Sequence, residues 1–215
     1  MTNTLHRQGT LESLKSDYVI FAYTAKGITR EGSGPKIQEF MQICLKYHPV
    51  NIGDSKQGNI FQDDIDIQKL ISNQGDGAGA TAAFTDLDTL QKVVEELIRA
   101  DLGLSINISG LLDEVKECCQ RVGIQRHSVE HSLGFWGAKD RLPEREILIF
   151  HTMCGHGMVS FNLIRKMIEY VKLRRLTPKK AATIMAKCCE CGAFNPVRAE
   201  MLLEKIRKGD KGMGR

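Results

Sequence analysis

Short apolar runs alternate with longer amphipathic stretches over the first 125 residues or so of the chain. Runs rich in β-branched, aromatic or alternating apolar residues predict strands at 17–23, 80–85 and 104–109. Between them, apolar residues recur every three or four positions, which is typical of helices, at 35–47, 86–99 and 111–122. Residues 63–73 can form a short helix, and 49–62 are compatible with an edge strand.

The stretch at 127–133 alternates as a strand does, with two histidines on one face, and we expect it to form a further strand. Strands separated by helices of about a dozen residues are typical of crossover units, which connect parallel strands. The sequence therefore predicts an α/β domain over 15–138, built on a mainly parallel sheet with crossover helices.

The pattern changes after residue 138, where helical periodicity and capping residues predominate. An apolar segment that begins at Pro143 and ends at His151 favours a helix, although part of it would also suit a strand. Three further helices with clear N-caps are expected at 161–174, 178–189 and 196–208. We expect a C-terminal helical subdomain over 139–208 and a disordered tail over 209–215.

The composition is that of an ordinary globular protein, with 42% hydrophobic and 26% charged residues. The net charge of +4 is a weak excess, and few aromatic residues accompany the basic positions, so a nucleic-acid partner is not expected. No apolar stretch reaches the roughly 18 to 20 residues of a membrane span, and the first residues lack the apolar core of a secretory signal. We expect a cytoplasmic protein without a membrane partner.

Two short cysteine-bearing runs lie in the C-terminal part of the chain. Cys154 precedes the predicted helix at 161–174, and Cys189 and Cys191 flank one residue at the end of the helix at 178–189. Because the connection between these helices is short, they are expected to be antiparallel, which brings Cys154 to the same end as the other two cysteines. Three adjacent thiols, in a chain with an odd number of cysteines, indicate a metal site.

A fourth ligand is open to several candidates. Cys119 lies on the apolar stripe of the helix at 111–122, and His156 lies two residues after Cys154. The other candidates are His151, His127 and His131. Cys188 continues the apolar stripe of its helix and is expected to point into the hairpin core.

The cysteine spacing favours an iron–sulfur cluster over a zinc site. Structural zinc sites usually separate paired cysteines by two to four residues, whereas clusters accept varied spacing. Zinc or another single ion remains an alternative. So does a site without metal, because free cysteines are often plain core residues.

These features suggest redox or Lewis-acid chemistry on a small molecule, with His127 and His131 as proton carriers and a small-molecule substrate or redox partner. Both histidines could equally lie on a half-exposed face without a role. Two other hypotheses stay open: a non-catalytic interaction module with a zinc-stabilised or simply packed hairpin, and an enzyme that uses Cys154 as a nucleophile. The sequence does not decide whether the protein is an enzyme.

A glycine-rich loop lies between the first strand and the following helix. It has the spacing of a phosphate-binding loop but lacks the lysine of that motif. Its backbone amides, at Gly32, Ser33 and Gly34, could still hold an anion, with help from Lys26, Arg30 or Lys36. A second loop, at 75–79, precedes a strand and therefore does not fit a dinucleotide-binding motif. Plain turns are the simpler interpretation of both loops.

Overall fold

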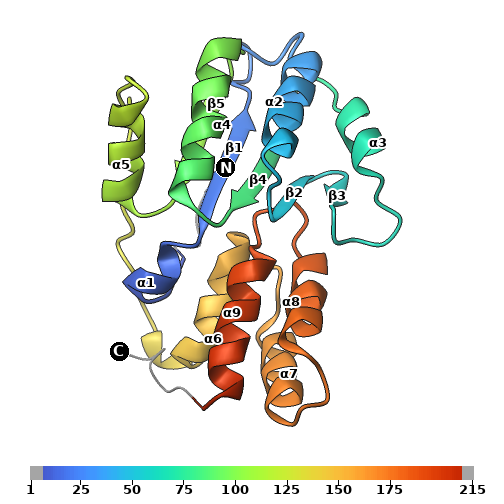
Figure 1. The fold of residues 1–215 in the computed structure, drawn as a ribbon, viewed down its shortest axis with the longest axis vertical. Coiled ribbons are helices and arrows are strands. Elements are labelled where there is room, and N and C mark those ends of the chain that lie inside the picture. The colour runs from blue at the N-terminus through green and yellow to red at the C-terminus, as the bar shows by residue number, and fades with distance from the viewer. Residues whose placement is uncertain (1–6, 210–215) are drawn as a thin grey trace.

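The computed structural model describes residues 7–209, and within them the chain forms a five-stranded sheet in the order β3-β2-β4-β1-β5 (Figure 1). The strands are β1 (Tyr18–Tyr23), β2 (Asn51–Asp54), β3 (Gly58–Asn59), β4 (Ala80–Phe84) and β5 (Ser105–Ser109). Every paired neighbour in this sheet is antiparallel. β1 lies near the middle, between β4 and β5.

The α/β class is confirmed, but the expectation of a mainly parallel sheet was wrong. β1 and β2 are both antiparallel to β4, so they run in the same direction, as a crossover connection requires. β4 lies between them, and β1 likewise lies between β4 and β5. Each crossover thus joins two strands that run in the same direction, with an antiparallel strand between them. This is the split βαβ arrangement.

The described residues contain nine α-helices. They are α1 (Leu11–Leu14), α2 (Gly34–Lys46), α3 (Ile67–Ser72), α4 (Leu87–Ala100), α5 (Leu112–Arg121), α6 (Arg145–His151), α7 (Phe161–Lys172), α8 (Pro178–Lys187) and α9 (Pro196–Arg207). The predicted helices are confirmed to within a few residues at each end. Local capping explains this, since the side chains of Asp86, Ser160, Thr177 and Asn195 each accept an amide hydrogen bond from the first turn of a helix.

The two faces of the sheet pack against different helices. Ile20 and Ala82 point to the face covered by α2 and α4, where Phe40 and Leu90 are fully buried. Val19 and Phe21 point to the opposite face and share a core with α6 to α9, which lie together in the lower half of Figure 1. The core of the helices over 139–208 is thus distinct from the core under α2 and α4, and includes Val19, Phe21 and Ala83 of the sheet.

The strand predicted at 127–133 was wrong, because this segment is irregular and exposed. Half of its supposed inner face consists of histidines, so burial would remove little apolar surface from water. Leu133 is 76% exposed and the nearby Trp136 is 81% exposed.

The predicted disordered tail lies, from residue 210 on, outside the described residues. No helix within 7–209 combines the length and apolar character needed to cross a lipid bilayer.

Candidate functional site

Three buried thiols lie in a row where the loop before α7 meets the loop between α8 and α9. The Cys154 thiol donates a hydrogen bond to Cys189, and the Cys189 thiol donates one to Cys191. The row ends at the imidazole of His156, whose Nδ1 lies 3.6 Å from the Cys191 Sγ. The thiols are at most 4% exposed, whereas His156 is exposed at the surface. The structure thus brings together four of the five residues predicted as metal ligands.

Backbone amides surround these sulfur atoms. Each sulfur accepts at least one such hydrogen bond: from His156 and Met158 to Cys154, from Phe194 to Cys189, and from Ala193 to Cys191. A thiol that only fills a core gap needs no amide donors. Amide hydrogen bonds to sulfur are typical of sites that hold thiolates, where they stabilise the negative charge.

A glycine follows Cys154 and Cys191 and turns the chain so that the next amide points back at the sulfur. Gly155 and Gly192 have φ values of 78° and 84°, in the left-handed region that favours glycine. Gly192 also lies against β2, since an added Cβ would come within 2.6 Å of the backbone of Ile52 and Gly53. An added Cβ at Gly155 would meet nothing within 4 Å. The Cys191 loop is therefore packed against the sheet at its glycine, whereas Gly155 faces open space.

The row of hydrogen bonds gives the three thiols different acidities. The bond to Cys189, together with burial, raises the pKa of Cys154 far above its ordinary value. For Cys189, the bond from Cys154 lowers the pKa, but the bond to Cys191 and burial outweigh it and raise the pKa to about 11. The bond from Cys189 lowers the pKa of Cys191, helped by the Ala193 amide and the charge of Arg7. Cys191, beside His156, is therefore the thiol of the row whose pKa is lowered, while those of the other two are raised.

Two asparagines of the short strands hold the Cys189 corner on the sheet. The side-chain amide of Asn59 donates to the carbonyl oxygens of Ala186 and Cys189, and that of Asn51 donates to the carbonyl oxygen of Phe194 at 2.9 Å. Both asparagines are fully buried. Sequence reasoning missed them, because 49–62 showed no clear periodicity, although polar amides in a candidate strand were a possible signal.

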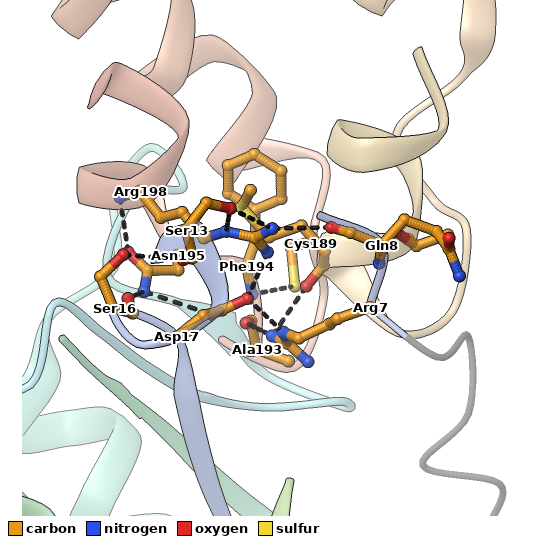
Figure 2. Close-up of polar contacts among 12 residues, drawn as sticks. Arg7, Gln8, Ser13, Ser16, Asp17, Cys189, Ala193, Phe194, Asn195 and Arg198 are labelled. Carbon is orange, nitrogen blue, oxygen red and sulfur yellow. Dashed lines mark hydrogen bonds and ion pairs between the residues drawn. The ribbon is translucent and has the colours of Figure 1, made fainter. Parts of the chain in front are cut away.

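A buried ion network lies beside the same two loops (Figure 2). Asp17, just before β1, pairs with Arg7 at 2.7 Å and with Arg198 of α9 at 2.6 Å. Arg7 also reaches the backbone of both cysteine loops through the carbonyl oxygens of Met153 and Ala193. Neither arginine was expected from the sequence, where both look like ordinary charged surface positions.

Two candidates for the fourth ligand, Cys119 and His151, lie elsewhere, and Cys188 was not expected to be a ligand. Cys119 is buried in α5 beside Cys118, and the described residues show no contact between it and the thiol row. Cys188 donates weakly to the Ile184 carbonyl oxygen at 3.7 Å, within its own helix. His151 Nδ1 lies 2.8 Å from the Val159 carbonyl oxygen, which satisfies that nitrogen.

His127 and His131, predicted as proton carriers, are not brought to the thiols. Both are exposed in the irregular segment after α5. His127 lines a cavity of about 890 Å³ beside β5, which Cys119 also lines, and within 7–209 neither histidine contacts the thiol row. Their expected place in a shared cleft depended on the strand that the structure lacks.

The glycine-rich loop before α2 already holds a carboxylate of the chain itself. The amides of Gly32 and Gly34 both donate to Asp76 at 2.8 Å, and the amide of Gly77 donates to the Ser33 hydroxyl. The Gly34 bond, followed by that of Gly32, lowers the pKa of Asp76. The predicted anion site at Gly32, Ser33 and Gly34 is thus closed by an internal anion, which comes from the second glycine loop.

Within residues 7–209, no group of three or more His, Cys, Asp or Glu side chains is arranged, as it stands, to hold a metal ion. The three thiols form a row joined by hydrogen bonds between sulfur atoms, whereas a metal ion needs its ligands arranged around one point. No family model, no curated protein and no solved structure matches this chain. Inferences about its function therefore depend on the geometry of the thiol row.

Proposed function

We propose that this chain is a zinc-binding protein in which Cys154, Cys189, Cys191 and His156 hold one tetrahedral ion. The observation that carries the proposal is the row of three thiols that accept backbone amides and end at an imidazole. Sulfur and nitrogen ligands of tetrahedral zinc lie about 2.3 and 2.0–2.1 Å from the ion, and therefore about 3.6 Å apart. The separation of His156 Nδ1 and Cys191 Sγ is 3.6 Å.

The contacts between the thiols favour a single ion over the iron–sulfur cluster that the cysteine spacing suggests. A cluster distributes its thiolates over several iron atoms, so most of its ligand sulfurs do not touch one another. Here Cys189 contacts a thiol on each side. Three thiolates and an imidazole are also a common ligand set of structural zinc sites.

Zinc binding would convert the row into a closed site by exchanging protons for the ion. One Zn²⁺ would displace the three thiol protons. The hydrogen bonds between the sulfur atoms would then be replaced by three sulfur–zinc bonds. The amide hydrogen bonds would remain and stabilise the thiolates. Cys189 already contacts a thiol on each side, which supports this exchange.

The position of the ligands supports a structural role for the ion. It would join the loop before α7 to the loop between α8 and α9, and Gly192 places the second loop on β2. Buried thiolates without an open position are typical of structural zinc. We also propose a reducing compartment such as the cytoplasm, because the seven cysteines are free and thiol ligands must stay reduced.

A second candidate function is thiol–disulfide exchange at Cys191. Its lowered pKa and its contact with Cys189 support this hypothesis. The Cys191 thiolate would attack a disulfide of a partner protein and release one thiolate; Cys189, after losing its proton, would then attack Cys191, release the second thiolate and leave a Cys189–Cys191 disulfide. Cys154 suits the role of nucleophile less well, because its pKa is raised.

The test is elemental analysis of protein purified without oxygen. We expect one zinc per chain and neither iron nor sulfide. Cys191→Ser should lose the zinc, whereas Cys44→Ser is the matched control, since Cys44 is a buried cysteine of the core under α2 and α4. Detection of iron together with sulfide would indicate an iron–sulfur cluster and contradict the zinc proposal. Metal-free protein in which one thiol reacts rapidly with iodoacetamide would favour the exchange reaction.

A further inference from the structure

Arg7 connects two loops that lie far apart in the sequence and carry the thiols. Its Nη2 donates to the Met153 carbonyl oxygen at 2.8 Å and to the Ala193 carbonyl oxygen at 2.5 Å. Met153 directly precedes Cys154, and Ala193 lies two residues after Cys191. A single guanidinium nitrogen thus fixes the distance between the backbones of the two cysteine loops.

Asp17 holds the Arg7 guanidinium in this position. Arg7 Nε donates to Asp17 Oδ2 at 2.7 Å, and Arg198 Nη1 donates to the same oxygen at 2.6 Å. The side chains of Asp17 and Arg198 are fully buried, and that of Arg7 is 7% exposed. Figure 2 shows Arg7 and Arg198 approaching Asp17 from opposite sides, close to Cys189.

The network carries one net positive charge, because two guanidiniums share one carboxylate. An unbalanced buried charge is costly unless an opposite charge lies nearby. A divalent ion bound by three thiolates and a neutral imidazole carries one net negative charge. The buried excess charge and the proposed zinc site therefore complement each other.

We propose that Arg7 is a positioning residue of the zinc site, which holds the two cysteine loops at ligand distance and balances the charge of the three thiolates. This inference depends on the proposed zinc site. The planar fork of arginine suits the task, since it donates to Asp17 and to two carbonyl oxygens in different directions. A lysine would keep the charge but not this geometry.

The test compares the zinc affinity of Arg7→Gln, Arg7→Lys and the wild type by competition with a chromophoric chelator. We expect Arg7→Gln to bind zinc about 10- to 100-fold more weakly, as is usual when a residue behind the ligands is lost. Arg7→Lys should fall between Arg7→Gln and the wild type. Arg165→Gln is the control, because Arg165 pairs with Glu144 at the surface. Wild-type zinc affinity in Arg7→Gln would overturn the proposal, even if that variant unfolds at a lower temperature.

A second measurement separates this inference from the zinc proposal itself. In metal-free protein, mass spectrometry can follow how fast iodoacetamide modifies Cys154, Cys191 and the distant Cys44. We expect Arg7→Gln to accelerate modification of the first two and not of Cys44, since only the first two are on loops that Arg7 holds. Equal acceleration at all three would mean that Arg7 only stabilises the fold and would overturn its positioning role. If the wild type binds no zinc, the zinc proposal fails and this measurement still decides whether Arg7 positions the loops.

Discussion

Two places in this chain bind side chains through backbone amides, and they differ in which side chains the amides bind. At the start of α2, the amides of Gly32 and Gly34 bind the Asp76 carboxylate. At the thiol row, amides bind three sulfur atoms that share protons among themselves. The first site receives a full negative charge from the chain, whereas the second consists mainly of neutral thiols.

The difference indicates which of the two sites is suited to bind an external ligand. A loop closed by its own carboxylate has its donors satisfied and is explained by its effect on stability. The thiol row has amide donors and a buried positive excess nearby, but its sulfurs gain full negative charge only when their protons leave. The comparison therefore separates a completed turn from a site that an ion would complete.

The largest effect is expected on removal of zinc. A ligand present at about 1,000 times its dissociation constant stabilises the folded state by about 4 kcal/mol, and a chelator should remove that contribution. Hydrogen exchange followed by mass spectrometry should then show faster exchange at His156 and Ala193 and unchanged exchange at Gly32 and Gly34. Equal changes at both sites would contradict the distinction between them.

Two glycine substitutions should distinguish the cysteine loop that packs on the sheet from the loop whose glycine faces open space. Gly192→Ala combines a positive φ with a Cβ that would clash with the backbone of β2, so we expect a loss of about 3 kcal/mol or more. Gly155→Ala meets only the positive φ, and a loss of about 1 kcal/mol is expected. Urea unfolding of the metal-free variants measures both. Equal losses would mean that β2 yields to the added methyl group.

Features with local causes could be predicted from the sequence. Asp86 and Asn195 cap helices through their own side chains, so the helix starts follow from neighbouring residues. The approach of Cys154 to Cys189 followed from a short connection between two helices. The order of the strands did not follow, because a crossover fixes the direction of two strands but not whether β4 enters between them.

The contacts that complete the site could not be predicted for a similar reason. Arg7 acts through carbonyl oxygens 146 and 186 residues away, and no spacing near position 7 announces this. Asn59 is likewise explained only by the place where α8 ends. In contrast, His127 and His131 were overinterpreted, since alternation without enough apolar residues did not produce a strand.

Alkaline pH should weaken the metal-free thiol row. The pKa of an unfolded cysteine is about 8.5. The folded pKa of Cys189 is about 11 and that of Cys154 is raised as well, so their contribution is complete below about pH 8.5 and is lost as the pH rises towards 11. The lowered pKa of Cys191 offsets part of this, and we expect a net loss of stability in urea unfolding as the pH rises from about 8.5 towards 11.

Zinc should reverse this pH dependence. Bound thiolates have already lost their protons, so the loaded protein should keep its stability at alkaline pH and release zinc on acidification. Asp76 gives the contrasting case, because its pKa is lowered; its contribution is present above about pH 3.9 and is lost below it, with or without zinc. An alkaline loss of the same size in loaded and metal-free protein would argue against the three thiols as ligands.

The smallest effect is expected for substitutions at Asp76 itself. Asp76→Ala leaves the amides of Gly32 and Gly34 to water and removes a negative charge from the start of α2, so the melting temperature should fall by about 2 to 4 °C. Asp76→Asn keeps one acceptor oxygen, so its melting temperature should fall by less. Differential scanning calorimetry measures both, and the zinc content of both variants should equal that of the wild type. In the described residues the Asp76 carboxylate bonds to the Gly32 and Gly34 amides and does not contact the thiols. A loss of zinc in Asp76→Ala would therefore contradict the independence of the two sites.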